Sequence, residues 1–197
     1  MLLATLLLTL LLLFRVTAAG QNVELVKKVE NQCFYWSPAA QWQSALVIPA
    51  AVDTLWETDL PHILIERVPD TPGNRKVRDY IIHHFHQLGG PSYHARWHVA
   101  EHTFTAQTPF GPKEMTNVIV TWGPQDAPRI VLAAHYDSKF MPGEHFVGAT
   151  DSAAPVAMLL SLATLLDKMP ITADRAVQFI FFDGEEAFVE WSAFDAM

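Results

Sequence analysis

The segment that most constrains this chain is Phe179–Trp191, in which an apolar run ends abruptly in the four residues Asp183–Glu186 (DGEE). An apolar run bounded by glycine and charge is typical of a buried strand, and Ala176–Phe182 fits a strand covered on both faces. Two adjacent carboxylates at the end of such a strand repel one another and are costly to desolvate. A cation would remove this conflict, with one glutamate as metal ligand and its neighbour as general base. A solvated turn is the alternative for an isolated pair.

Two further acidic motifs are expected at the same edge of the sheet. The apolar run Ile130–Ala134 is followed by a His-x-Asp motif that begins at His135, and Asp151 then opens an expected helix, Ala153–Leu166. The order strand, helix, strand predicts a βαβ unit with parallel strands and a right-handed crossover. Parallel strands place their carboxyl ends together, where open α/β sheets bind ligands, so His135, Asp151 and Glu186 are expected to be neighbours. Asp151 alone could instead be a helix N-cap.

The rest of the protein is expected to complete one α/β domain around this unit. Apolar residues at helical spacing predict a helix over Arg75–Leu88, closed by glycines. Ala45–Glu66 is expected to be helical and broken at Pro61. Two β-rich stretches, Trp97–Thr108 and Met115–Trp122, predict an antiparallel hairpin at the sheet edge.

Three histidines fall on the predicted helix Arg75–Leu88, namely His83, His84 and His86. Histidine-rich clusters can bind metal. We expect a surface or half-buried structural role for these three, because no acidic partner lies on their face of the helix.

The composition is that of a globular protein whose partners are not nucleic acids. Of the 197 residues, 50% are hydrophobic and 17% charged, which is enough for one packed domain. The formal net charge is −8 and the 13 Lys and Arg residues are scattered, whereas nucleic-acid binding demands clustered positive charge.

Five segments resemble glutaminyl-peptide cyclotransferases, also called glutaminyl cyclases, over roughly 51–192. They are LIERVPDTPGN (Leu64–Asn74), FTAQTPFGPKEMTNVIVTW (Phe104–Trp122), HYDSK (His135–Lys139), FVGATDSAAP (Phe146–Pro155) and FIFFDGEEAFVEWS (Phe179–Ser192). The wider clan is the zinc aminopeptidases, which share the His-x-Asp, Asp and Glu-Glu motifs. The resemblance implies an α/β fold with a mixed, mostly parallel sheet flanked by helices, of which the C-terminal part is expected to be missing.

The resemblance also implies a reaction and a site. The family converts N-terminal Gln, and slowly Glu, of peptides and hormones to pyroglutamate, with release of ammonia or water. One Zn²⁺ per complete site would be held by Asp151, Glu186 and a histidine from the C-terminal stretch that we expect to be missing here. Glu185 would be the catalytic acid and base, and Trp191 would pack on the substrate. His135 and Asp137 would stand behind the metal ligands.

Two other functions remain open at this point. A zinc aminopeptidase would use the same carboxylates and His135 to bind two metals and activate water. A non-catalytic secreted remnant is the other possibility, because the family continues well beyond the Trp191 region. We therefore expect this short protein to be inactive or weakly active.

The N-terminus is expected to be a signal peptide covering residues 1–20. Leu2–Phe14 is a 13-residue apolar stretch, too short to span a bilayer, followed by small residues suited to cleavage after Ala19 or Gly20. This predicts secretion with no transmembrane span after cleavage; a Golgi anchor through an uncleaved segment is the alternative. Residues 21–50 are an N-terminal segment of uncertain structure, and 51–197 are expected to form an incomplete cyclotransferase domain.

The sequence contains a single cysteine, Cys33, so an intrachain disulfide is impossible. Secreted members of the glutaminyl cyclase family often have a disulfide between the residue before the His-x-Asp motif and the start of the following helix. Those positions are Ala134 and Val156 here, so that disulfide is absent.

Overall fold

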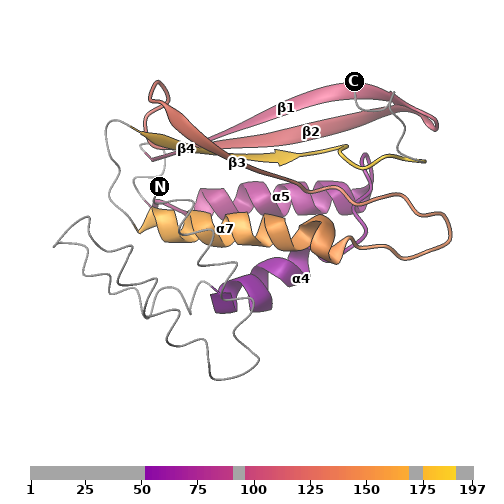
Figure 1. Cartoon of the computed structure of the whole chain (residues 1–197), viewed down its shortest axis with the longest axis horizontal. Helices are drawn as coiled ribbons and strands as arrows, with labels where there is room; N and C mark the ends of the chain where they lie inside the picture. Colours follow the sequence, from indigo (N-terminus) through magenta and orange to yellow (C-terminus); the bar gives the residue numbers. More distant parts are fainter. Residues whose placement is uncertain (1–51, 91–95, 169–174, 190–197) are drawn as a thin grey trace, which may run out of the picture. The chain divides into compact units, whose positions relative to one another are not determined.

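The computed structural model describes residues 52–90, 96–168 and 175–189, which all belong to one compact unit, Leu46–Met197. Within it a four-stranded sheet has the order β1-β2-β4-β3 (Figure 1). The strands are β1 (Trp97–Thr108), β2 (Gly111–Trp122), β3 (Arg129–His135) and β4 (Ala176–Phe182). The expected signal peptide, the segment 21–50 and Trp191 lie outside the described residues.

The sheet is mixed, and helices flank it, as expected. β1 and β2 form the predicted antiparallel hairpin with a two-residue turn, since Thr108 pairs with Gly111. β3 and β4 are parallel, in register from Arg129 with Ala176 to His135 with Phe182, and α7 (Ala154–Asp167) connects them. β2 joins β4 antiparallel, so the parallel pairing among the described strands is confined to β3 and β4.

The described helices cover one face of the sheet, where α5 (Pro72–Gln87) and α7 lie side by side (Figure 1). Phe179 and Phe181 of β4 are fully buried on this face, each with its ring centroid 5.8 Å from that of Phe85. On the opposite face Phe182 is 40% exposed. The expectation that β4 is covered on both faces is therefore not met within the described residues, because alternate side chains of a strand point to opposite faces.

Helix α5 begins three residues before the predicted start. The Thr71 side chain accepts a hydrogen bond from the backbone N–H of Asn74, and Pro72 occupies the first turn, a common N-terminal arrangement. The helix ends at Gln87, and Gly89 follows with a φ of 73°. Val77, Ile81 and Phe85 line its buried face.

The predicted break at Pro61 is wrong. Helical turns run through residues 52–54, the π-turn η1 (Leu55–Asp59) and α4 (Leu60–Ile63). The backbone N–H of Leu60 bonds to the carbonyl of Leu55, and Pro61 falls in the first turn of α4, where its missing N–H costs little. The helical segment ends at Ile63, three residues before the predicted end.

The half-buried structural role expected for the α5 histidines is confirmed for His84, whose acidic partner comes from another element. Its Nδ1 lies 3.5 Å from Oδ1 of the buried Asp59, which also accepts a hydrogen bond from the Tyr80 hydroxyl at 2.7 Å. Asp59 belongs to η1, so the partner comes from a different element and could not be found on the face of α5. His84 therefore has a structural role that ties α5 to η1.

The apolar helix α7 follows the irregular turn η3 (Ala149–Ala153), which contains Asp151. Ala153 is the N-cap residue of α7, and Asp151 makes no capping hydrogen bond there, which removes the N-cap interpretation. Among the described residues, the combined stretch Ala149–Asp167 is long and apolar enough to cross a membrane. Since 61% of its most apolar window is buried inside the fold, it is the core helix of this domain.

Candidate functional site

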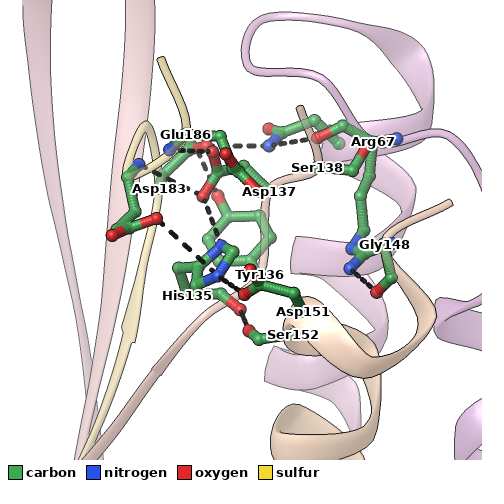
Figure 2. Close-up of polar contacts among 12 residues, drawn as sticks. Arg67, His135, Tyr136, Asp137, Ser138, Gly148, Asp151, Ser152, Asp183 and Glu186 are labelled. Atoms are coloured by element: carbon green, nitrogen blue, oxygen red, sulfur yellow. Dashed lines mark hydrogen bonds and ion pairs between the residues drawn. The ribbon is translucent and has the colours of Figure 1, made fainter. Parts of the chain in front are cut away.

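The carboxyl ends of β3 and β4 lie side by side and bring the three acidic motifs together (Figure 2). β3 ends at His135, β4 ends one residue before Asp183, and Asp151 lies in the turn before α7. The parallel register explains why residues that are far apart in sequence share this edge.

His135 lies at the centre of the site between buried and exposed carboxylates. Its Nε2 is 2.8 Å from Oδ1 of Asp151 and 3.7 Å from Oε2 of Glu185, and its Nδ1 is 3.3 Å from Oδ1 of Asp137. Burial alone would lower the pKa of His135, but its interactions with the carboxylates of Asp137 and Asp151 raise it to about 9. The imidazole is therefore a cation in the metal-free protein at neutral pH.

Asp137 is fully buried and fixes the turn that carries both glutamates. Its two carboxylate oxygens accept hydrogen bonds from the backbone N–H groups of Glu185, at 3.2 Å, and Glu186, at 3.0 Å. Gly184 makes this turn with a φ of 74°, a conformation that favours glycine. Asp137 thus holds the main chain of both glutamates, and this contact does not use their side chains.

Asp183, which in the sequence is distinguished only as the first residue of the DGEE turn, is a buried anchor. It accepts hydrogen bonds from Asn74 Nδ2 at 2.8 Å, the Thr116 backbone N–H at 2.9 Å and the Tyr136 hydroxyl at 3.1 Å. Burial raises its pKa to about 6. Its neighbours come from α5, β2 and the loop after β3, so one carboxylate ties the end of β4 to three parts of the fold.

Arg67 is a second buried group whose role could not be predicted from the sequence. Its side chain is fully buried, and burial lowers the pKa of its guanidinium to about 10. The guanidinium donates to the carbonyl of Gly148 at 3.0 Å (Figure 2). It donates to the carbonyl of Val147 as well. It also donates to the carbonyls of Ile63 at 3.4 Å and Ile65 at 3.2 Å. Arg67 therefore pins the loop that leads to Asp151.

The close packing of this loop requires glycine at position 148. Gly148 has a φ of 47°, and a Cβ there would collide with the backbone carbonyl oxygen of Asp151. The main chain of Arg67 reaches the other acidic loop as well, because its N–H donates to the Ser138 hydroxyl at 3.0 Å. Arg67 and Gly148 thus set the position of Asp151. In the sequence they lie in LIER and VGAT, which are parts of the segments that resemble glutaminyl cyclases.

Three of the site residues could gather around one metal ion. His135, Glu185 and Glu186 each offer a ligand atom, and these atoms lie within 4.8 Å of one another. Burial and the nearby charge of Asp151 raise the pKa of Glu186, and the charges of His135 and Lys139 offset only part of this shift. Imidazole nitrogen and carboxylate oxygen are donors that zinc uses, so the residues present fit a zinc ion. Asp151, expected as a ligand with Glu186, bonds here to His135 instead.

Comparison with known proteins relates this protein to one group of enzymes. The Peptidase family M28 model matches residues 117–196. Glutaminyl-peptide cyclotransferase of Gloydius blomhoffii is 45% identical over 159 residues, covering 74% of this chain and 42% of that protein. The Bos taurus cyclotransferase is 41% identical over 158 residues, covering 75% of this chain and 42% of the relative. The chain thus spans less than half the length of these relatives.

Solved structures show the same relationship. Glutaminyl cyclase of Macrostomum lignano has a TM-score of 0.63 at 35% identity, and the match covers 77% of this chain and 45% of that structure. A Zn-dependent exopeptidase of Parabacteroides distasonis has a TM-score of 0.58 at 24% identity over 72% of this chain and 51% of that structure, and so shares the fold alone. The expected resemblance and the mixed α/β fold are confirmed.

Proposed function

We propose that this protein, as a homologue of glutaminyl-peptide cyclotransferases, contains the active-site edge of the sheet of an enzyme that cyclises N-terminal Gln. The product would be pyroglutamate with release of ammonia, and N-terminal Glu would react slowly with release of water. The observation that carries the proposal is the pair Glu185 and Glu186, whose backbone is held by the buried Asp137 and whose side chains lie beside His135.

In the proposed reaction the substrate's α-amine attacks its own γ-amide carbon. A bond forms between the α-nitrogen and this carbon to close the ring, the bond from the carbon to the amide nitrogen breaks, and ammonia leaves. Glu185 would accept the proton released by the amine and donate it to the departing nitrogen. Its side chain is half exposed, which gives it access to both nitrogens. Because nucleophile and electrophile belong to one residue, holding their geometry contributes much of the rate.

We propose that Glu186 holds one zinc ion together with Asp151 or His135. A zinc ion bound there would supply Lewis-acid polarisation of the γ-amide carbonyl. Asp137 would keep the two glutamates in place through their backbone N–H groups, and Arg67 would keep the Asp151 loop in place through its carbonyls. Trp191, outside the described residues, would pack against the glutaminyl side chain.

A zinc aminopeptidase is the second candidate function, favoured by one observation. Nε2 of His135 lies within 3.7 Å of carboxylate oxygens from both Asp151 and Glu185, the arrangement needed if His135 holds a metal. The M28 match is compatible with this function. Hydrolysis of amino-acid arylamides with two zinc ions bound per molecule would favour the peptidase. Ammonia release from Gln-initiated dipeptide amides with one zinc favours the cyclase.

The residue roles are tested by two substitutions that remove the carboxylate charge and keep the size of the side chain. Glu185→Gln should abolish ammonia release and leave bound zinc near one ion per molecule. Glu186→Gln should lose the zinc. Ammonia is measured in a coupled assay and zinc by mass spectrometry. Glu57→Gln, at an exposed glutamate of η1, is the matched control and should change neither. Loss of zinc with retained activity in Glu185→Gln would reverse the two roles.

We further propose that the protein enters the secretory pathway through residues 1–20 and meets N-terminal Gln or Glu peptides there. The apolar stretch Leu2–Phe14 supports this, with a Golgi anchor as the alternative. Processing in secretory cells would show it: a mature protein beginning after Ala19 or Gly20 supports cleavage, and an intact N-terminus in the Golgi supports the anchor.

A further inference from the structure

Two acidic segments of the candidate site share one buried support. The first is the DGEE turn (Asp183–Glu186), and the second is the Asp151 loop, by which we mean Val147–Asp151. Asn74, in the first turn of α5, is 2% exposed and bonds to the anchors of both segments. Its side chain is too deeply buried to contact a substrate, so its effect on the site must act through these anchors.

The amide nitrogen of Asn74 serves both segments at the same time. Its Nδ2 donates to Oδ1 of Asp183 at 2.8 Å and to the backbone carbonyl of Arg67 at 3.3 Å. A side-chain amide nitrogen carries two N–H donors, and both are used here. Asp183 is the first residue of the DGEE turn, whereas the guanidinium of Arg67 holds the carbonyls of Val147 and Gly148. One planar amide group therefore links the support of one segment to the support of the other.

The first turn of α5 is packed against the main chain to which Asn74 bonds. The Thr71 hydroxyl accepts a hydrogen bond from the backbone N–H of Asn74 at 3.3 Å, which fixes the start of the helix. Gly73 packs so closely that a Cβ there would collide with the backbone carbonyl oxygen of Glu66. Asn74 therefore has little freedom to move away from Arg67.

The carbonyl of Arg67 also connects Asn74 to the residues that follow β3. It accepts a second hydrogen bond, from the backbone N–H of Ser138 at 3.3 Å, and the N–H of Arg67 donates in return to the Ser138 hydroxyl at 3.0 Å. Ser138 follows Asp137, whose carboxylate holds the backbone N–H groups of both glutamates of the DGEE turn. The acceptor of Asn74 is thus part of the network that holds these glutamates.

We propose that Asn74 is a positioning residue that keeps the DGEE turn and the Asp151 loop at the separation at which Glu186 and Asp151 can share one zinc ion. This inference rests on the proposed function, because it takes these two residues as zinc ligands. An asparagine suits the position, since its uncharged amide offers two donors to two acceptors. A carboxylate there would repel Asp183 and offer no donor, and a serine hydroxyl offers a single one.

Hydrogen exchange in the metal-free protein tests the coupling with one reporter in each segment. The backbone N–H of Glu186 is held in the DGEE turn, and that of Ala153 bonds across the Asp151 loop to the carbonyl of Gly148 at 3.0 Å. In Asn74→Ser both N–H groups should exchange about tenfold faster, because one donor replaces two. The N–H of Leu160, in the middle of α7, should keep its rate.

Two further variants complete the comparison. Asn74→Gln keeps both N–H donors on a longer side chain, so both reporters should change less than in Asn74→Ser; if Asn74→Ser does not fold, the same comparison is made with Asn74→Gln. The matched control is Thr121→Val, which removes another buried polar group. The Thr121 hydroxyl accepts a hydrogen bond from Gln178, four residues before the end of β4, at 3.1 Å. This variant should leave both reporters unchanged.

Zinc affinity, measured by competition with a chelator, connects this coupling to the metal site. Asn74→Ser should weaken zinc binding by about tenfold, the order expected when a group that supports the ligands is lost. Thr121→Val should bind zinc like the unaltered protein. The visible absorption of bound Co²⁺ should also change in Asn74→Ser, because it depends on the geometry of the ligands.

Three outcomes would overturn the inference. Faster exchange at Glu186 alone would limit Asn74 to the DGEE turn, and equal acceleration at Leu160 would assign it to global stability. Faster exchange at both reporters with unchanged zinc affinity would show that the coupling does not serve the metal site. If the unaltered protein binds no zinc, the zinc site of the proposed function fails, and the exchange comparison alone decides whether Asn74 couples the two segments.

Discussion

The site contains two pairs of carboxylates that differ in their exposure to solvent and in their hydrogen-bond partners. Asp137 and Asp183 are 0% and 5% exposed, and fixed protein donors surround both. Asp151 and Glu185 have side chains that are 73% and 50% exposed, and His135 is the partner that they share. The first pair holds the fold together, whereas the second pair faces the solvent.

The difference shows which acidic groups are structural. A buried carboxylate is tolerated when N–H and O–H donors satisfy it, and such donors are fixed by the fold. A carboxylate with few protein donors keeps its capacity to bind a ligand. Glu186 lies between these extremes, because burial and the charge of Asp151 raise its pKa. A bound cation would offset the negative charge of Glu186. The candidate metal site therefore lies at Glu186 and the solvent-facing carboxylates beside it.

The largest effect should come from removing a buried anchor. Asp183→Ala leaves the Asn74 amide, the Thr116 N–H and the Tyr136 hydroxyl without their acceptor, which should lower the free energy of unfolding by about 4 kcal/mol. Urea unfolding measures the loss. Asp183→Asn keeps one acceptor oxygen and should lose about half as much. A loss below about 1 kcal/mol in Asp183→Ala would mean that Asp183 is not structural.

The second effect concerns the buried cation. Arg67→Met keeps the apolar volume but leaves the carbonyls of Val147 and Gly148 unsatisfied, so we expect a loss of about 3 kcal/mol and weaker zinc binding through Asp151. Arg75→Met is the matched control, because Arg75 forms an exposed ion pair with Asp70 at 3.4 Å and should lose at most about 0.5 kcal/mol. Equal losses in the two variants would contradict the structural role of Arg67.

The sequence predicted the solvent-facing pair better than the buried pair. The ends of parallel strands meet at one edge, so the contact between His135 and Asp151 follows from the order of the motifs. The partners of Asp183 could not be derived, because the side chain of Asn74 is 109 residues away and belongs to a helix whose packing partners are not encoded in its hydrophobic periodicity. Arg67 was missed for the same reason, since a buried arginine has no signature in hydrophobic patterning.

A smaller effect is expected from the pH dependence of the metal-free protein. The charges facing His135 come from Asp137, Asp151 and Glu185. Its folded-state pKa of about 9 exceeds the ordinary value of 6.5, because the interactions with the carboxylates of Asp137 and Asp151 outweigh burial. Its stabilising contribution is therefore complete below pH 6.5 and lost as the pH rises through 9.

Solvent near the exposed Asp151 screens part of this interaction, so we expect a decline of about 1–2 kcal/mol between these pH values. Urea unfolding with a chelator measures it, and His135→Gln should remove this component. Added zinc should abolish the decline if His135 is a ligand, because a ligating imidazole carries no extra proton. An unchanged pH dependence in His135→Gln would show that other groups cause it.

The smallest effect on stability should come from the residue with the largest expected effect on catalysis. The Glu185 side chain is 50% exposed, and its contact with His135 Nε2 spans 3.7 Å, so solvent compensates for most of what Glu185→Gln removes. The free energy of unfolding should change by less than about 0.5 kcal/mol, while ammonia release is lost. Urea unfolding and the ammonia assay on one preparation give both values. A loss of stability above about 1.5 kcal/mol would place Glu185 with Asp137 and Asp183 among the structural carboxylates. A negligible change would show that folding and function use different parts of one residue. The backbone N–H of Glu185 stabilises the fold through its hydrogen bond to Asp137, whereas the side chain remains available to a substrate.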